Sequence, residues 1–227
     1  MKLVLLHAFP LDERMWEPQH AVLSGRDVYA PSLYGLGASM DEWARQILAE
    51  IDGEFVAVGA SMGGYCALAL ARAAPYRIRR LMLIGARAEA DPPERRKARN
   101  ETIELIRQKG TQALWDDLAP KLFVDPLSSM AEVAYGIINR LDPEALVIGA
   151  GAMRDRADAT NVIDTLACPV DVAVGEHDAF FSPEEARALA NRAAEGKSFV
   201  FEDSGHLPSL ERFTDFNRYL VGFLAGV

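Results

Sequence analysis

Residues 59–63 read Gly-Ala-Ser-Met-Gly, so Ser61 lies in the pattern G-x-S-x-G. An apolar run with β-branched residues, 55–58, precedes this pattern, and a run rich in alanine and leucine, 64–72, follows it. The order predicts a strand, a sharp turn and a helix, which is the setting that lifts such a serine clear of a sheet as a nucleophile. The alternative is a glycine-rich turn with no chemical role.

A serine hydroxyl acts as a nucleophile only with a base beside it and donors for the oxyanion that its attack produces. His206 follows a strand-like run at 198–201, and Asp178 follows an apolar run at 170–175. In an open parallel sheet, the carboxyl ends of the strands form the edge where sites assemble. The sequence therefore predicts that Ser61, Asp178 and His206 meet there as nucleophile, acid and base.

The same segments contain rivals for two of these roles. Glu176 is an alternative to Asp178 as the acid, and His177 is an alternative to His206 as the base. His177 adjoins the acid on the same loop, so we expect it at the surface. His7 follows the first predicted strand, and we expect it to make structural hydrogen bonds rather than to act as a base.

Taken together, these motifs resemble those of the α/β-hydrolase family over nearly the whole chain. Residues 7–10, His-Ala-Phe-Pro, resemble the family's H-G-x-P oxyanion loop, with alanine in place of the usual glycine. Residues 30–39 are similar to its D-x-x-G-x-G-x-S segment, although Ser32 stands where aspartate is common. The segments at 175–178 and 205–206 resemble its acid loop and histidine loop.

This resemblance implies roles for five residues. Ser61 would be the nucleophile, Asp178 the acid and His206 the base of a catalytic triad. The backbone N–H groups of Phe9 and Met62 would form the oxyanion hole. No cofactor and no metal are implied.

The expected fold is an α/β fold with a mostly parallel sheet flanked by helices, because strand-like and helical segments alternate. We expect six strands rather than the family's usual eight, since the oxyanion loop begins only seven residues into the chain. Strands are expected near 2–7, 27–30, 54–59, 79–85, 169–175 and 197–202. Helices are expected near 40–51, 62–73, 183–194 and 209–225.

Residues 87–160 interrupt this alternation and resemble the family's cap, a helical lid inserted in the core. The core would then consist of residues 1–86 and 161–227. Four helices are expected in the insertion, at 93–109, 111–124, 128–141 and 143–154. Such a lid shapes the substrate pocket, which is mostly apolar in enzymes. The candidates for its lining are Trp115, Phe123 and Met153.

Composition narrows the classes of partner. The 227 residues carry a formal net charge of −9, which argues against nucleic acid, whose binding needs a basic face. No apolar run approaches the length of a membrane span, and the two cysteines, Cys66 and Cys168, are expected to be reduced and buried. We therefore expect a cytoplasmic protein that acts on a small molecule, with its oligomeric state left open. The one basic run, 94–99, is expected to be a solvated helix face laced with ion pairs.

The activity that these features imply is a serine hydrolase that cleaves a small carboxylic ester or lactone through an acyl-enzyme. Ser61 excludes the aspartate-nucleophile chemistry of related epoxide hydrolases and dehalogenases. A carbon–carbon bond hydrolase or a lyase could use the same triad. A non-catalytic binding module with the same fold is the alternative from another class. Labelling by a fluorophosphonate probe would discriminate between an active serine hydrolase and such a module.

Overall fold

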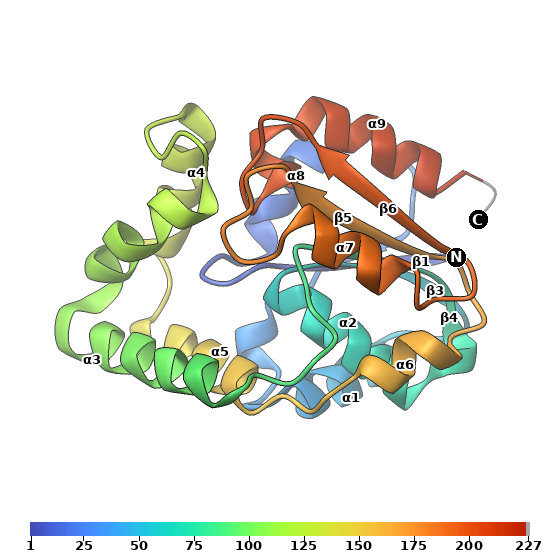
Figure 1. Cartoon of the computed structure of the whole chain (residues 1–227), viewed down its shortest axis with the longest axis horizontal. Helices are drawn as coiled ribbons and strands as arrows, with labels where there is room; N and C mark the ends of the chain where they lie inside the picture. Colours follow the sequence, from blue (N-terminus) through green and yellow to red (C-terminus); the bar gives the residue numbers. More distant parts are fainter. Residues whose placement is uncertain (226–227) are drawn as a thin grey trace.

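The computed structural model describes residues 1–225 and is built around one sheet of six parallel strands (Figure 1). The order across the sheet is β2-β1-β3-β4-β5-β6, as expected of an α/β fold. The chain leaves β1 toward one edge of the sheet and β3 toward the other, and ligands bind at such a switch point in open α/β sheets. The strands are β1 (Lys2–Leu6), β2 (Val28–Tyr29), β3 (Phe55–Ala60), β4 (Ile78–Ile84), β5 (Val170–Gly175) and β6 (Gly196–Phe201).

Helices cover the sheet on both sides, with α1 and α2 on one side and α9 on the other (Figure 1). Strands β3 and β5 are buried at every position; the sequence of β3 is apolar throughout, whereas β5 contains Asp171, whose carboxylate accepts a hydrogen bond from the hydroxyl of Tyr219. The helices are α1 (Met40–Glu50), α2 (Met62–Ala73), α3 (Pro93–Leu122), α4 (Ser129–Ile138), α5 (Pro143–Arg154), α6 (Thr160–Thr165), α7 (Pro183–Ala190), α8 (Pro208–Glu211) and α9 (Phe213–Phe223). Short 3₁₀ turns are η1 (Glu13–Gln19), η2 (Leu33–Gly35) and η3 (Pro75–Arg77).

Two helical segments differ from the sequence expectation, whereas the break expected at Gly110 is confirmed. The helices expected at 93–109 and 111–124 share the label α3 and meet at Gly110, whose non-helical φ of 74° a residue without Cβ adopts easily. The helix expected over 209–225 is divided at Arg212 into α8 and α9. Helix α6 was not expected, because its six residues are mostly polar and bury only Ile163.

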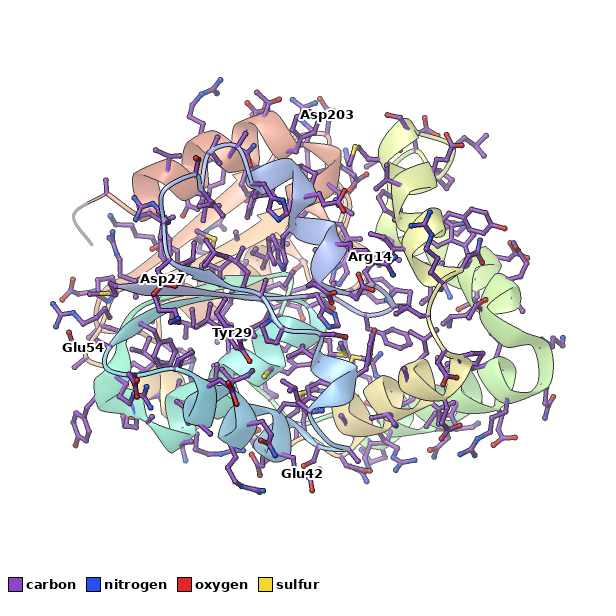
Figure 2. The ribbon with its side chains drawn as sticks, turned by 180° about the vertical axis from the view of Figure 1, so that it is seen from behind. Arg14, Asp27, Tyr29, Glu42, Glu54 and Asp203 are labelled. Carbon is purple, nitrogen blue, oxygen red and sulfur yellow. The ribbon has the colours of Figure 1, made fainter. Side chains whose placement is uncertain are left out.

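Helices α3, α4 and α5 form a helical insert at the end of the sheet where the strands finish (Figure 1). Gly149 of α5 packs against the ring of Tyr34 in η2 so closely that a Cβ at this position would collide with it. Arg14 of η1, paired with Asp12, donates a hydrogen bond of 3.4 Å to the carbonyl of Ile137 in α4. Figure 2 shows Arg14 beside the insert, so both contacts hold the insert over this end of the sheet.

Candidate active site

Ser61 occupies a strained turn between β3 and α2. Its φ of 50° and ψ of −112° lie outside the regions that residues with a side chain normally populate. The turn is tight because Gly59 contacts the backbone of Gly63, and Gly63 contacts the backbone of Leu6 at the end of β1. A Cβ at either glycine would collide with backbone atoms, so the two glycines of the motif are required by the space available.

His206 and Asp178 form a buried pair. Nδ1 of His206 lies 2.7 Å from Oδ2 of Asp178, and their side chains are 4% and 0% exposed. The other carboxylate oxygen of Asp178 accepts the backbone N–H groups of Phe180 and Phe181 at 2.8 and 3.1 Å. These bonds fix the carboxylate so that it can accept a hydrogen bond from Nδ1–H of the imidazole, which leaves Nε2 unprotonated in that tautomer.

Aromatic and backbone contacts fix the imidazole from two other directions. The ring of Phe180 meets the ring of His206 edge-on, with 4.8 Å between centroids. The backbone N–H of His206 donates to the carbonyl of Leu122 at the end of α3. The loop that carries the histidine is therefore attached both to the acid loop and to the helical insert.

Glu211 strengthens the second attachment. Its carboxylate accepts the N–H of Gly205, next to the histidine, and the N–H of Val124, just beyond α3, both at 2.7 Å. Burial raises the pKa of Glu211, while these hydrogen bonds oppose the rise. One carboxylate thus joins the histidine loop to the end of the insert.

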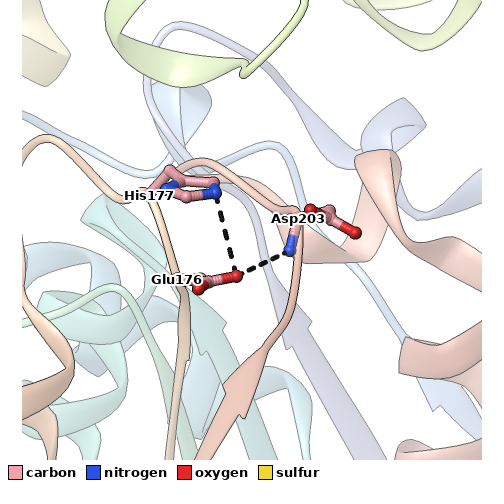
Figure 3. A group of neighbouring side chains, drawn as sticks. All are labelled: Glu176, His177 and Asp203. Carbon is pink, nitrogen blue, oxygen red and sulfur yellow. Dashed lines mark hydrogen bonds and ion pairs between the residues drawn. The ribbon is translucent and has the colours of Figure 1, made fainter.

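Glu176 and His177 form a separate, exposed group together with Asp203 (Figure 3). They form a weak ion pair with 3.7 Å between Nε2 and Oε2, and their side chains are 52% and 48% exposed for His177 and Glu176. Glu176 also accepts the N–H of Asp203 at 3.1 Å. The side chains of Glu176, His177 and Asp203 have possible metal-ligand atoms within 4.8 Å of one another. Because all three are exposed, we do not assign a metal site to them.

The segment after β1 lies beside Ser61. Burial lowers the pKa of His7 to about 4, so its imidazole is neutral. Its Nε2 accepts the N–H of Leu33 at 2.9 Å, and its Nδ1 lies 3.2 Å from the carbonyl of Ala8, an arrangement that ties the segment to η2. Phe9, two residues on, lines the same pocket as Ser61. Met62 begins helix α2, so its N–H is one of the four that have no partner within a helix.

The pocket that holds Ser61 and His206 is small, about 60 Å³. Of the three insert residues expected in its wall, Met153 lines it. Trp115 and Phe123 do not: Trp115 packs against Phe123 and Tyr135, with ring centroids 6.0 and 5.6 Å away. Apolar residues at helical spacing satisfy either role, and here the two aromatic rings pack within the insert.

The same pocket is lined by three arginines, Arg87, Arg95 and Arg99. The interpretation of 94–99 as a solvated face is therefore wrong for Arg95 and Arg99, which turn inward from α3. It holds for Lys97, which forms an exposed ion pair with Glu101 one helical turn away. The physical reason is that an arginine can bury its stem along an apolar wall while its head keeps polar contacts.

These geometric features agree with the comparisons to known proteins. The family model described as "Alpha/beta hydrolase family" matches residues 3–218. This chain belongs to the α/β-hydrolase family. The assignment agrees with the parallel sheet, with the strained turn at Ser61, and with the order Ser61, Asp178, His206 along the chain.

Three proteins that are similar to this α/β hydrolase are known by name. A pimeloyl-[acyl-carrier protein] methyl ester esterase from Aromatoleum aromaticum is 30% identical, with 94% of each chain covered. The structure of a thermophilic esterase from Thermogutta terrifontis, with malate bound, is 31% identical, with a TM-score of 0.91 over 99% of this chain and 89% of that chain. The enol-lactonase from Burkholderia xenovorans is 26% identical, with a TM-score of 0.83 over 98% and 90%.

The relatives are named as enzymes, and this α/β hydrolase is an enzyme whose relatives are consistent with carboxylic-ester hydrolysis. None of the helices in the described part of the chain combines the length and apolar character needed to cross a bilayer.

Several residues that line this hydrolase's pocket were not predicted from the sequence. Phe180 lies two residues beyond Asp178, and Tyr65 lies in the first turn of α2. On α3, the positions 95, 99, 102 and 106 share one face by helical spacing, and Ile106 is buried. That spacing was the available signal that Arg95 and Arg99 face inward.

Proposed function

We propose that this α/β hydrolase is a serine esterase that cleaves a small carboxylic ester or lactone through an acyl-enzyme. The observation that carries the proposal is the buried pair of His206 and Asp178 in the pocket that also holds the strained Ser61. A histidine oriented by a buried carboxylate, lining one pocket with a serine, is the arrangement that nucleophilic acyl transfer requires.

In the proposed reaction, Nε2 of His206 takes the proton of the Ser61 hydroxyl as Oγ attacks the ester carbonyl. Asp178 accepts the Nδ1–H bond and stabilises the imidazolium that forms. The imidazolium then gives its proton to the leaving alcohol, and an acyl-enzyme remains. A water molecule, activated by the same histidine, releases the acid and restores Ser61.

The backbone N–H groups of Phe9 and Met62 are the proposed oxyanion hole. Phe9 lines the pocket of Ser61, and Met62 follows Ser61 at the start of α2, where the helix dipole favours negative charge. One such donor is worth about 3 kcal/mol at the transition state. Both donors are backbone groups, so replacement of the family's usual glycine by Ala8 leaves them in place.

We also propose that residues 87–160 are the cap of the enzyme, with 1–86 and 161–227 as its core. Met153, Leu118 and Leu122 of the insert line the pocket together with Ser61 and His206 from the sheet. Its volume of about 60 Å³ is far below the 300 Å³ or more of common ligand pockets, which favours a short acyl group.

A fluorophosphonate probe tests the proposal. The probe should label the wild-type protein at Ser61 and fail to label Ser61→Ala, and methyl and p-nitrophenyl esters of graded chain length should be hydrolysed by the wild type alone. Ser209→Ala is the matched control, because it removes another buried serine hydroxyl, one with no hydrogen-bond partner among the described residues, without touching the proposed nucleophile. Equal labelling of wild type and Ser61→Ala would contradict the proposal.

The same panel separates the alternatives. Turnover of carbon–carbon substrates in place of esters, still dependent on Ser61, would favour a carbon–carbon bond hydrolase. Absence of both labelling and turnover would favour a binding module.

A further inference from the structure

The pocket beside Ser61 has a charge opposite to that of the whole chain. The protein carries a formal net charge of −9, yet the guanidinium groups of Arg87, Arg95 and Arg99 line the pocket. An arginine head that is withdrawn from water costs free energy unless an anion or a hydrogen-bond acceptor meets it. The partners of the three arginines therefore decide what the pocket can bind.

Two of the three arginines are already paired. Arg87 forms an ion pair with Glu185 and donates a 2.6 Å hydrogen bond to the carbonyl of Phe180, so it holds the ring that meets His206. Arg99 lies 3.3 Å from the fully buried carboxylate of Asp91.

Asp91 is also shared with a fourth guanidinium. Arg156, whose side chain is 4% exposed, lies 2.6 Å from the other oxygen of Asp91 and stacks 4.0 Å above the ring of Tyr65. One carboxylate therefore serves two arginines, so the cluster around Asp91 keeps an excess of positive charge toward the pocket.

Arg95 is the third pocket arginine, and within residues 1–225 no carboxylate lies within ion-pair distance of it. The side chain is half-buried, and its burial together with the charges of Arg87 and Arg99 lowers its pKa. Both causes reflect a cation that an anion would stabilise. Its neighbour Arg96 differs: it points away and pairs with Asp155 at 2.8 Å.

Arg95 also stands at the exit of the pocket. A second, wider groove of about 550 Å³ shares five wall residues with the pocket of Ser61, and these are Arg95, Arg99, Thr102, Leu118 and Phe180. In this groove, Lys121 is neutralised by Asp117 at 2.8 Å. A substrate whose ester lies at Ser61 would therefore pass Leu118 and Phe180 and bring its outer end to Arg95.

We propose that the preferred substrate is an anionic ester, whose reacting carbonyl lies at Ser61 and whose free carboxylate is bound by Arg95 at the junction of the pocket and the groove. This inference rests on the proposed esterase function and specifies its substrate class. A carboxylate matches the planar fork of a guanidinium with two parallel hydrogen bonds. A charge-assisted pair of this kind, partly shielded from water, corresponds to a preference of about 10- to 100-fold.

The test compares esters that differ only in the terminal charge. In the first pair the acyl side carries the charge: monomethyl glutarate has a free carboxylate and methyl pentanoate has none. In the second pair the alcohol side carries it: 4-acetoxybenzoate is anionic and its methyl ester is neutral. Wild-type kcat/KM should be higher for the anionic member of at least one pair. The pair that shows this preference identifies whether Arg95 binds the acyl side or the alcohol side of the ester. In Arg95→Gln, the ratio of anionic to neutral kcat/KM should fall by about 10- to 100-fold.

Arg96→Gln is the matched control, because it removes the same charge one residue away, from a side chain that pairs with Asp155 at the end of α5 and lines neither the pocket nor the groove. Its ratio should stay within twofold of the wild type, whereas a general effect of net charge would lower both variants equally. Equal ratios in wild type and Arg95→Gln, or a wild-type preference for the neutral member of both pairs, would overturn the inference. Neutral esters would still be cleaved in that case, so the proposed esterase function would stand.

A binding measurement tests the anion site without turnover. Pentanoate should bind the wild type more tightly than pentanamide in calorimetric titrations, and Arg95→Gln should lose this difference while Arg96→Gln keeps it. Equal affinity of the wild type for the two ligands would count against the site even if the enzyme proved not to be an esterase.

Discussion

Two pairs of a histidine and a carboxylate involve the loop after β5 of this hydrolase, and their surroundings differ. His206 and Asp178 are 2.7 Å apart and almost fully buried, whereas His177 and Glu176 are 3.7 Å apart and about half exposed. Water competes for the second pair and screens it, so an exposed pair of this kind contributes little. Burial and fixed hydrogen bonds, not residue type, separate a pair suited to catalysis from a surface pair.

The largest effect is expected when the histidine of each pair is replaced. His206→Ala should lower kcat/KM for a good ester by about 10⁴-fold or more, because Ser61 loses the group that accepts its proton. His177→Ala should lower it less than tenfold. The double variant of Ser61→Ala and His206→Ala should be little worse than either alone, since such residues act as a unit. A loss confined to the His177 variant would reverse the assignment.

The next effect tests the acid. Asp178→Asn keeps the shape of the side chain but favours the wrong tautomer of His206, so kcat should fall by about 10³- to 10⁴-fold. Glu176→Gln is the matched change in the exposed pair and should leave kcat within threefold. Circular dichroism should show both proteins folded. Comparable losses in the two variants would mean that burial is not what distinguishes the pairs.

The position of the candidate site at this edge of the sheet was predictable, because its signals are local. The serine turn needs glycines at 59 and 63 for lack of space, and His206 and Asp178 follow directly after strands. The parallel sheet then brings residues from distant parts of the sequence to one edge. The strand bounds agree with the expected ones to within one residue at every end, because each strand is a short run rich in apolar and β-branched residues.

The pocket wall was harder to predict, because tertiary packing decides it. Arg95 and Arg99 belong to a run that reads as a solvated helix face, and only the docking of α3 over the sheet turns them inward. Trp115 and Met153 have the same apolar character in the sequence, yet Met153 faces Ser61 and Trp115 faces other aromatic rings. The side of a helix that meets a cavity depends on contacts far away in the sequence.

Those two residues give the next prediction. Trp115→Ala should lower the free energy of unfolding by about 3–5 kcal/mol and leave the ratio of kcat/KM between short and long esters unchanged, because the ring packs within the insert. Met153→Ala should change that ratio by about tenfold, since methylene groups in an apolar pocket are worth about 1–3 kcal/mol. Chemical denaturation and an ester chain-length series measure both quantities. A changed ratio in Trp115→Ala would place its ring at the substrate instead.

The smallest expected effect concerns a third histidine, His7, which is buried and, within residues 1–225, has no carboxylate at ion-pair distance. Its pKa is lowered to about 4 by burial, so the folded protein keeps it neutral while the unfolded chain protonates it near pH 6.5. The unfolded state thus binds more protons between these values, and stability is lost as the pH falls from about 6.5 to about 4. Since one pKa unit corresponds to about 1.4 kcal/mol, the loss from this group is on the order of 3 kcal/mol.

A replacement of His7 sharpens this last point. His7→Gln keeps an acceptor for the N–H of Leu33 but cannot be protonated, so its melting temperature should fall less between pH 7 and pH 4.5 than that of the wild type, by roughly 5–10 °C. His177→Gln is the control, because it makes the same change at an exposed position, and its curve should follow the wild type. Parallel curves for all three proteins would show that the acid sensitivity of this hydrolase arises from its carboxylates, and that the neutral imidazole of His7 contributes little to holding the loop after β1.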